Sequence, residues 1–146
     1  MKILVSACLL GQKCKYNGGD NFSEEVASFT RGHEVIPVCP EVAGGLSVPR
    51  VPCEIVNGEV TGKTGQSRDK EYRLGAEKCL AVAKQHQIEL AILQSRSPSC
   101  GVKQIYDGTF SGRLIEGSGV FASLLMQNGF RVIDVQDIGQ TKSKKS

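Results

Sequence analysis

The sequence lacks any run of apolar residues long enough to cross a membrane. The apolar stretch near its start, Ile3-Leu4-Val5, is also far shorter than the core of a secretory signal peptide, which needs about seven apolar residues or more. These two absences predict a cytoplasmic protein. Because thiols stay reduced in the cytoplasm, the six cysteines indicate metal binding or catalysis rather than a disulfide framework.

A strong charge of either sign is missing as well. The 146 residues carry a formal net charge of +3, whereas a nucleic-acid-binding domain would show a denser basic patch. The length suits one domain with a real core. We therefore predict a single domain over residues 1–137, a disordered basic tail over 138–146, and a small, anionic substrate rather than nucleic acid.

A complete phosphate-binding P-loop is also absent. Residues 58–64 come close, but they are one residue short between the glycines, and Gly58 is needed for a hairpin turn. This excludes hydrolysis of nucleoside triphosphates. Histidine is scarce, since only His33 and His86 occur, and both fit surface or core positions better than a metal site.

What the sequence does contain is an alternation of strand-like apolar runs and helical segments. This alternation favours parallel strands joined by right-handed crossovers. Asn57-Gly58 between apolar residues predicts a small hairpin. The expected fold class is α/β: a single-domain, Rossmann-like, mainly parallel sheet flanked by helices, with a β-hairpin insertion. The expected strands are 2–6, 34–38, 90–94 and 131–135, the helices 23–31, 67–87 and 120–128, the hairpin 54–61, and the long loop 39–50.

Three of the cysteines directly follow predicted strands: Cys8, Cys39 and Cys100. Ligands of an open parallel sheet bind at the carboxyl ends of its strands, so these thiols are expected to meet in one pocket. A free cysteine is often only a small buried hydrophobe, which suits Cys79 on the apolar side of a helix. Cys14 lies in the first loop and could be a spare thiol near the pocket.

Three thiolates suit a catalytic metal centre better than a structural one. Structural zinc and electron-transfer clusters usually take four protein ligands, and a free coordination position is what a Lewis-acid catalyst needs. The residues alone leave several functions open. One is a cluster-dependent lyase or hydratase, and another is a non-catalytic module that senses a metal or carries a cluster.

Four motifs in order resemble the DUF523 family, which includes the TudS thiouracil desulfidases. They span residues 6–11, 14–18, 38–50 and 95–101. The resemblance implies a [4Fe-4S] cluster held by Cys8, Cys39 and Cys100. It also implies non-redox removal of sulfur, as hydrosulfide, from a small thiolated pyrimidine base or nucleotide such as 2-thiouracil or 4-thiouridine monophosphate.

This resemblance suggests roles for individual residues. Glu41 would act as the general base toward water, and Ser97 would bind the substrate or relay a proton. Simpler roles are an ion pair of Glu41 with Arg50 or Arg96, and capping of the turn at Pro98 by the serines. The expected substrate contacts lie in the first loop, beside Cys100 and at a helix start: Lys13, Lys15, Tyr16, Asn17, Ser99 and Ser118. The sequence leaves the oligomeric state open.

Overall fold

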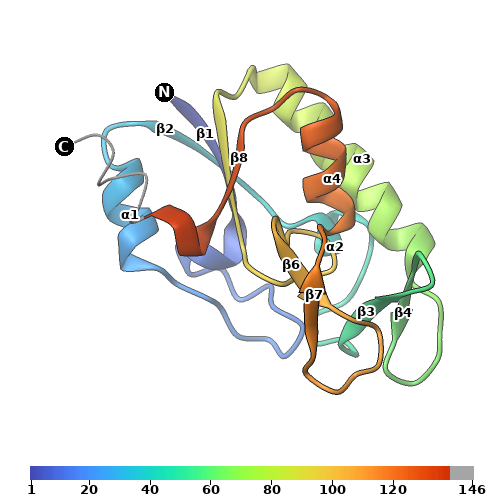
Figure 1. Ribbon diagram of the computed structural model, residues 1–146. Coiled ribbons are helices and arrows are strands. Elements are labelled where there is room, and N and C mark those ends of the chain that lie inside the picture. Colours follow the sequence, from blue (N-terminus) through green and yellow to red (C-terminus); the bar gives the residue numbers. More distant parts are fainter. Residues whose placement is uncertain (139–146) are drawn as a thin grey trace.

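The structure is a computed structural model that describes residues 1–138 of the chain. Within this part, four parallel strands form the central sheet in the order β2-β1-β5-β8 (Figure 1). The central strands are apolar along most of their length because both faces of the sheet are covered. The predicted α/β class with a mainly parallel sheet is confirmed. The strands are β1 (Lys2–Ser6), β2 (Glu34–Val38), β5 (Leu90–Leu93) and β8 (Val132–Asp134).

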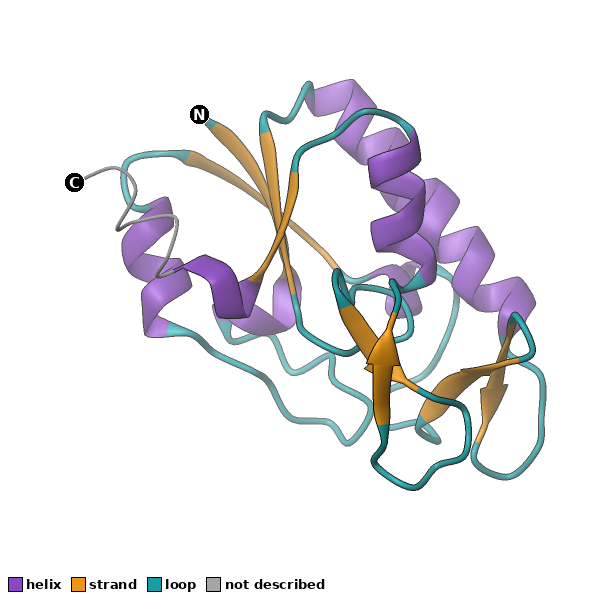
Figure 2. Ribbon diagram, in the orientation of Figure 1, coloured by secondary structure: helices purple, strands orange, loops and turns teal. Residues whose placement is uncertain are grey.

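Helices cover both faces of the sheet (Figure 2). On one face lie α3 (Asp69–His86) and α4 (Val120–Gln127), which share a buried cluster with Leu4 of β1. On the other face lies α1 (Glu24–Thr30), which shares a second buried cluster with Ile3. Neighbouring residues of β1 belong to different clusters because side chains alternate between the two faces of a strand.

Two hairpins lie beyond the carboxyl end of the sheet. The predicted one is confirmed as β3 (Cys53–Val56) and β4 (Glu59–Gly62) around the turn at Asn57-Gly58. The second, β6 (Gln104–Tyr106) and β7 (Leu114–Glu116), was not predicted. Its strands are three residues long, too short to show an alternating apolar pattern.

The segment 39–50 was predicted to be a loop throughout, and this is wrong for its first part. A short helix, α2 (Pro40–Ala43), begins directly after β2, with Cys39 as its N-cap residue and a proline in its first turn. Proline fits the first turn of a helix because the missing N–H has no partner there in any case. The glycines and prolines that follow hid this single turn from pattern analysis.

A close crossing of α2 and α3 fixes the position of α2. A Cβ atom on Gly75 of α3 would lie 1.7 Å from the carbonyl oxygen of Pro40, and one on Gly44 would lie 2.0 Å from that of Glu71. No side chain fits at either position, so the two backbones can approach this closely only through glycine. The crossing brings the first turn of α2 against the first turns of α3.

Two short 3-10 helices complete the described elements: η1 (Ala7–Leu10) follows β1, and η2 (Val135–Asp137) follows β8. Ile138 comes directly after η2 and ends the described part of the chain. It was assigned to the predicted tail, yet it is 1% exposed and packs in the cluster on the α1 face. It therefore belongs to the folded domain. The rest of that tail, residues 139–146, lies outside the described residues.

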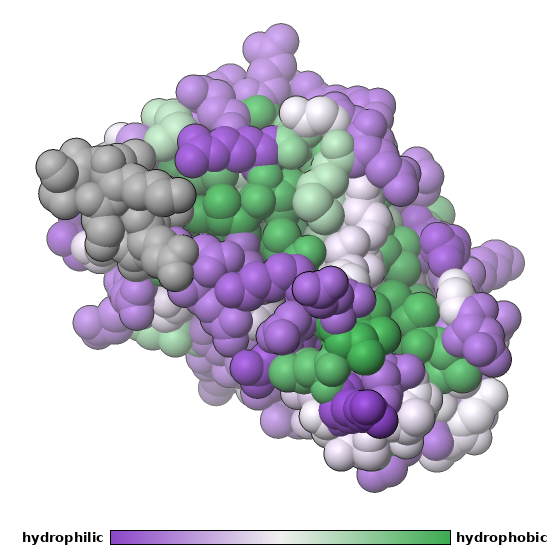
Figure 3. Space-filling model, in the orientation of Figure 1, coloured by the Kyte–Doolittle hydropathy of each residue, from purple (hydrophilic) through white to green (hydrophobic). Residues whose placement is uncertain are grey.

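Hydrophilic residues cover much of the face seen in Figure 3, and hydrophobic residues show around β8 and over the β6–β7 hairpin. Among residues 1–138, no helix has both the length and the apolar character needed to cross a membrane.

Candidate active site

A cavity of about 720 Å³ lies at the carboxyl ends of β1, β2 and β5. Its volume is in the range of small-molecule binding sites. It also lies where the strand order reverses, beside β1 and β5, which is the usual ligand position in an open parallel sheet. Of the cysteines in the described residues, those that line it are Cys8, Cys14, Cys39, Cys53 and Cys100.

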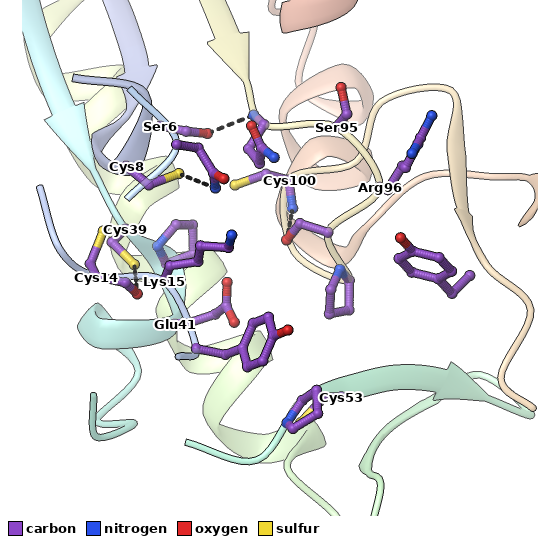
Figure 4. Close-up of a pocket in the computed structure, with 18 of the residues that line it drawn as sticks. Ser6, Cys8, Cys14, Lys15, Cys39, Glu41, Cys53, Ser95, Arg96 and Cys100 are labelled. Carbon is purple, nitrogen blue, oxygen red and sulfur yellow. Dashed lines mark hydrogen bonds between the residues drawn. The ribbon is translucent and has the colours of Figure 1, made fainter. Parts of the chain in front are cut away.

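Three different strand ends deliver the predicted ligand cysteines to this cavity. Cys8 lies in η1 directly after β1, Cys39 directly follows β2, and Cys100 lies in the loop after β5. Figure 4 shows the sulfur atoms of Cys8 and Cys100 pointing toward a common space, with Cys14 next to Cys39. The structure thus brings together three thiols that are far apart in the sequence.

Polar groups surround two of these sulfur atoms. Asn21 Nδ2 donates a hydrogen bond to Cys8 Sγ over 3.4 Å, and Ser99 Oγ lies 3.6 Å from Cys100 Sγ. Burial raises the pKa of the Cys100 thiol well above its ordinary value, and it raises that of Cys8 against the opposing effect of the Asn21 bond. A bound metal would have to displace these thiol protons.

The donor set fits a cofactor larger than a single ion. Among residues 1–138, no group of three or more His, Cys, Asp or Glu side chains is close enough together to hold one metal ion. Three thiols instead line a shared cavity, and Asn21 donates a hydrogen bond to one of the sulfurs. Iron–sulfur clusters use cysteine thiolates as ligands and respond to such hydrogen bonds, so these residues could hold one.

Glu41, in the first turn of α2, reaches the same cavity and is held from several sides. Its Oε1 accepts hydrogen bonds from Tyr72 Oη over 2.7 Å and from Arg50 Nε over 3.3 Å, and Arg50 Nη2 lies 3.2 Å away. Its Oε2 accepts one from Ser99 Oγ over 3.1 Å. The ion pair with Arg50 that the sequence offered as a simpler role is therefore present, and it orients the carboxylate within the cavity.

Arg50 and Tyr72 are themselves buried by this arrangement. The Arg50 side chain is 7% exposed and also donates from Nη2 to the carbonyl oxygen of Cys14 over 2.9 Å, which ties the first loop to the site. Burial lowers the pKa of Arg50. The nearby Glu41 outweighs burial, together with smaller effects of Tyr72 and Cys39, so the pKa is raised overall. Burial and the nearby Glu41 raise the pKa of Tyr72, so its hydroxyl remains a hydrogen-bond donor.

Two serines link Glu41 to the cysteine loop. Ser97 Oγ accepts the backbone N–H groups of Ser99 and Cys100, each over 3.1 Å, so it caps the turn at Pro98 as the simpler hypothesis stated. The same oxygen lies 3.0 Å from Ser99 Oγ, which donates to Glu41. A continuous chain of hydrogen bonds thus runs from the cavity wall to the carboxylate.

The predicted substrate contacts divide into two groups. Lys15 and Tyr16 line the cavity. Ser99 is buried next to the cavity and donates a hydrogen bond to Glu41. Three others are not brought to the cavity: Lys13, Asn17 and Ser118.

These three residues lie away from the cavity in two different ways. Lys13 and Asn17 are exposed, and the Asn17 side chain accepts the backbone N–H of Gly19 over 2.9 Å in a local turn. Ser118 lines a separate cavity of about 310 Å³ together with residues of α3 and α4. The start of a helix attracts anions in general, but local sequence does not indicate on which side of the molecule a helix begins.

Several cavity residues escaped the sequence analysis. Tyr72 falls within the predicted helix 67–87, where its spacing is that of a core residue and gives its hydroxyl no role. Arg50 was named only as a partner of Glu41. Tyr106 and Phe110 lie on the unpredicted second hairpin, so no local pattern pointed to them. The cavity also receives Asn21, Cys53, Glu54, Lys63, Gln94, Ser95, Arg96 and Gln136.

The chain has clear relatives. The model of a family described as 2-thiouracil desulfurase matches residues 3–137. The uncharacterized protein YbbK of Bacillus subtilis (strain 168) is 42% identical in an alignment that covers 93% of this chain and 97% of YbbK. A solved structure of the [4Fe-4S]-dependent thiouracil desulfidase TudS is similar with a TM-score of 0.89 and 36% identity, covering 95% of this chain and 93% of that one.

Proposed function

This chain belongs to the 2-thiouracil desulfurase family, and from this premise we propose that it is a [4Fe-4S]-dependent desulfidase of small thiolated pyrimidines. The observation that carries the proposal is the cavity in which Cys8, Cys39 and Cys100 lie beside Glu41. The similarity to TudS supports the cluster. The substrates that we propose are 2-thiouracil and 4-thiouridine monophosphate, with sulfur leaving as hydrosulfide.

Cys8, Cys39 and Cys100 would hold the cluster. When bound, it supplies a Lewis acid for the thiocarbonyl sulfur, which makes the adjacent carbon more electrophilic. In the net reaction, the oxygen of water replaces sulfur on that carbon. The carbon–sulfur bond breaks, sulfur leaves as hydrosulfide with one of the protons of water, the other proton is released to solvent, and no electron is exchanged.

Glu41 is the group that we assign as general base for the attacking water. Oε1 is occupied by hydrogen bonds from Tyr72 and Arg50, whereas among residues 1–138 Oε2 accepts only the one from Ser99. A carboxylate oxygen has about two lone-pair positions, so Oε2 keeps one for the proton of water. The donors on Oε1 orient the carboxylate so that this position is available to the cavity.

Ser97 is suited to move a proton between the substrate and Glu41. Its oxygen already accepts two backbone N–H groups, so its hydroxyl is left to donate. Ser99 uses its own proton on Glu41 Oε2 and accepts from Ser97. Donation along this chain therefore runs from Ser97 through Ser99 to Glu41, and the proton that Glu41 gains from the attacking water becomes available to the departing sulfur.

Lys15 and Tyr16 are the two predicted substrate contacts that line the cavity. Lys63 and Arg96 line it as well, so positive charge is available for the phosphate of a nucleotide. These groups support 4-thiouridine monophosphate as a substrate beside the free base.

The test begins with protein prepared without oxygen, in which iron and acid-labile sulfide are measured. The loaded protein is then incubated with 2-thiouracil and with 4-thiouridine monophosphate. We expect about four iron atoms and four sulfides per chain, and hydrosulfide in an amount equal to the uracil or uridine monophosphate formed. Stoichiometric zinc, transfer of the cluster to an acceptor protein, or activity only on hydroxyl-containing substrates would overturn the proposal.

A further inference from the structure

The loop between β6 and β7 contributes an apolar ring to the same cavity. Tyr106, at the end of β6, and Phe110, in the loop, both line it. In Figure 1 this hairpin lies beyond the carboxyl end of the sheet and beside β3. The second hairpin, which was not predicted from the sequence, therefore forms part of the wall of the candidate site.

Phe110 holds an unusual backbone conformation. Its φ is +57°, in the left-handed region that bulky residues rarely adopt. Arg96, another non-glycine residue with positive φ (+65°), lines the same cavity. Such conformations persist only where the surroundings impose them, and they concentrate at functional sites.

Glu54 of β3 holds the loop through two of its backbone N–H groups. Its Oε1 accepts the backbone N–H of Gly108 over 2.9 Å and that of Phe110 over 3.2 Å. Gly108 also packs against β3, since a Cβ atom there would lie 2.6 Å from the carbonyl oxygen of Ile55. An ionised carboxylate makes stronger bonds to N–H groups than a neutral acceptor does, so Glu54 fixes the loop to β3.

We infer that Phe110 is a stacking contact for the pyrimidine ring of the substrate and that Glu54 is its positioning residue. The inference rests on the proposed function and adds a ring subsite to it. The phenyl ring has no polar group, so its contribution to a binding site is apolar contact with a flat surface. A pyrimidine offers such a surface, and aromatic stacking recognises a base by its face whatever substituents its edge carries.

The first experiment measures binding of uracil, which lacks sulfur, to the anaerobically prepared protein by titration calorimetry. We expect Phe110→Ala to weaken uracil binding by about 5- to 150-fold, the range for loss of one stacked base. Phe110→Tyr should bind as the wild type does, because it keeps the ring. Phe22→Ala is the matched control: that ring is 53% exposed and does not line the cavity.

The second experiment tests the positioning role of Glu54 on protein without cluster. In Glu54→Ala, hydrogen exchange at the amides of Gly108 and Phe110 should accelerate by about ten-fold or more, with exchange in the central sheet unchanged. Glu54→Gln keeps an acceptor oxygen and should restore most of the protection. Glu59→Ala, an exposed change on the neighbouring strand β4, should leave both amides as in the wild type.

Kinetics with 2-thiouracil connect the two roles. Phe110→Ala and Glu54→Ala should each raise KM with a small change in kcat, and the double variant should be no worse than Phe110→Ala alone, because both act through one contact. Unchanged uracil binding in Phe110→Ala, or no binding to the wild type, would overturn the inference. If the wild type binds uracil through Phe110 but releases no hydrosulfide, the subsite stands and the desulfidase proposal fails.

Discussion

The hydroxyl of Tyr72 and the carboxylate of Glu41 form a 2.7 Å hydrogen bond between two helices that cross at glycine residues. Tyr72 is 2% exposed, and Glu41 reaches the cavity that contains the cysteines. The tyrosine thus lies behind the carboxylate and orients it from the core side. The position of the Glu41 carboxylate therefore depends on this contact and on the crossing of α2 with α3.

Glu41→Gln should reduce turnover of 2-thiouracil by about 100-fold or more, since general-base catalysis contributes about 10²–10⁴. Iron and sulfide content should stay at the wild-type level, because none of the proposed cluster ligands is changed. Hydrosulfide release and iron content are measured on the same sample. Turnover near the wild-type rate would exclude Glu41 as the base.

Tyr72→Phe should lower kcat less than the change at Glu41 does, by about 3- to 30-fold, because Arg50 and Ser99 still hold the carboxylate. The ring remains in the core, so the free energy of unfolding should fall by about 1.5–3 kcal/mol, the value for a hydrogen bond to a charged group. Steady-state kinetics and urea unfolding give the two values. A loss of turnover equal to that of Glu41→Gln would instead give Tyr72 a direct part in the reaction.

The cysteines of the cavity should differ in their effect on the cluster. Serine at Cys8, Cys39 or Cys100 should remove most of the bound iron after anaerobic reconstitution. Serine at Cys14 or Cys53, which line the same cavity, should leave the iron content unchanged. Iron analysis of the five variants decides the ligand set, and loss of iron in Cys14→Ser would show that the first loop supplies a ligand.

Gly75→Ala should destabilise the protein, although alanine in a helix interior is ordinarily more stable than glycine by about 1 kcal/mol. The new methyl group would collide with the Pro40 carbonyl oxygen, and we expect a loss of about 2–4 kcal/mol in the free energy of unfolding. Leu74→Ala, on the exposed side of the same helix, is the control with little effect. Equal unfolding midpoints for the two variants would contradict the close crossing.

Asp69, in the first turn of α3, should give the stability a pH dependence. Its Oδ2 accepts from Arg73 Nε over 2.7 Å and its Oδ1 accepts the backbone N–H of Val60 over 3.0 Å. Burial alone would raise the pKa of Asp69, but these bonds outweigh burial and lower it below its ordinary value of 3.8. The ionised form therefore stabilises the folded protein above about pH 4, and this contribution is lost as the pH falls through the folded-state pKa.

Asp69→Asn should accordingly reduce the free energy of unfolding at pH 7 by up to about 1 kcal/mol. The difference from the wild type should shrink as the pH falls below the ordinary pKa. Urea unfolding at pH 7 and at pH 3 measures both effects, with the exposed Glu59→Gln as control. A deficit that stays constant between the two pH values would contradict this origin.

The parts of the fold that sequence analysis predicted are those with a strong local signal. Apolar runs located β1, β2 and β5, and the parallel connection then required Cys8, Cys39 and the loop of Cys100 to meet at one edge. Ser23 stands at the start of the predicted helix 23–31, and its Oγ caps that helix by accepting the Val26 N–H over 3.2 Å. These features depend on a few neighbouring residues and on general rules of chain topology.

The parts that escaped prediction depend on contacts between distant residues. Tyr72 has the spacing of a core residue, and only the crossing with α2 gives its hydroxyl a partner 31 positions away. Phe110 reaches the cavity because Glu54, 56 positions earlier, holds its amide. Ser118 is the opposite case. Its position at the start of a helix was predicted from local sequence, but the side of the molecule on which that helix begins was not.

The strand order has a consequence for biosynthesis. Cys8 and Cys39 follow strands that pair with each other, whereas the strand before Cys100 joins the sheet on the other side of β1. A nascent chain that has emerged only as far as α3 would therefore contain two of the three thiols, and its cavity would lack the wall that the loop after β5 supplies. Iron can be loaded in the proposed manner only after β5 has emerged and docked, so delivery of the cofactor has to follow the synthesis of Cys100.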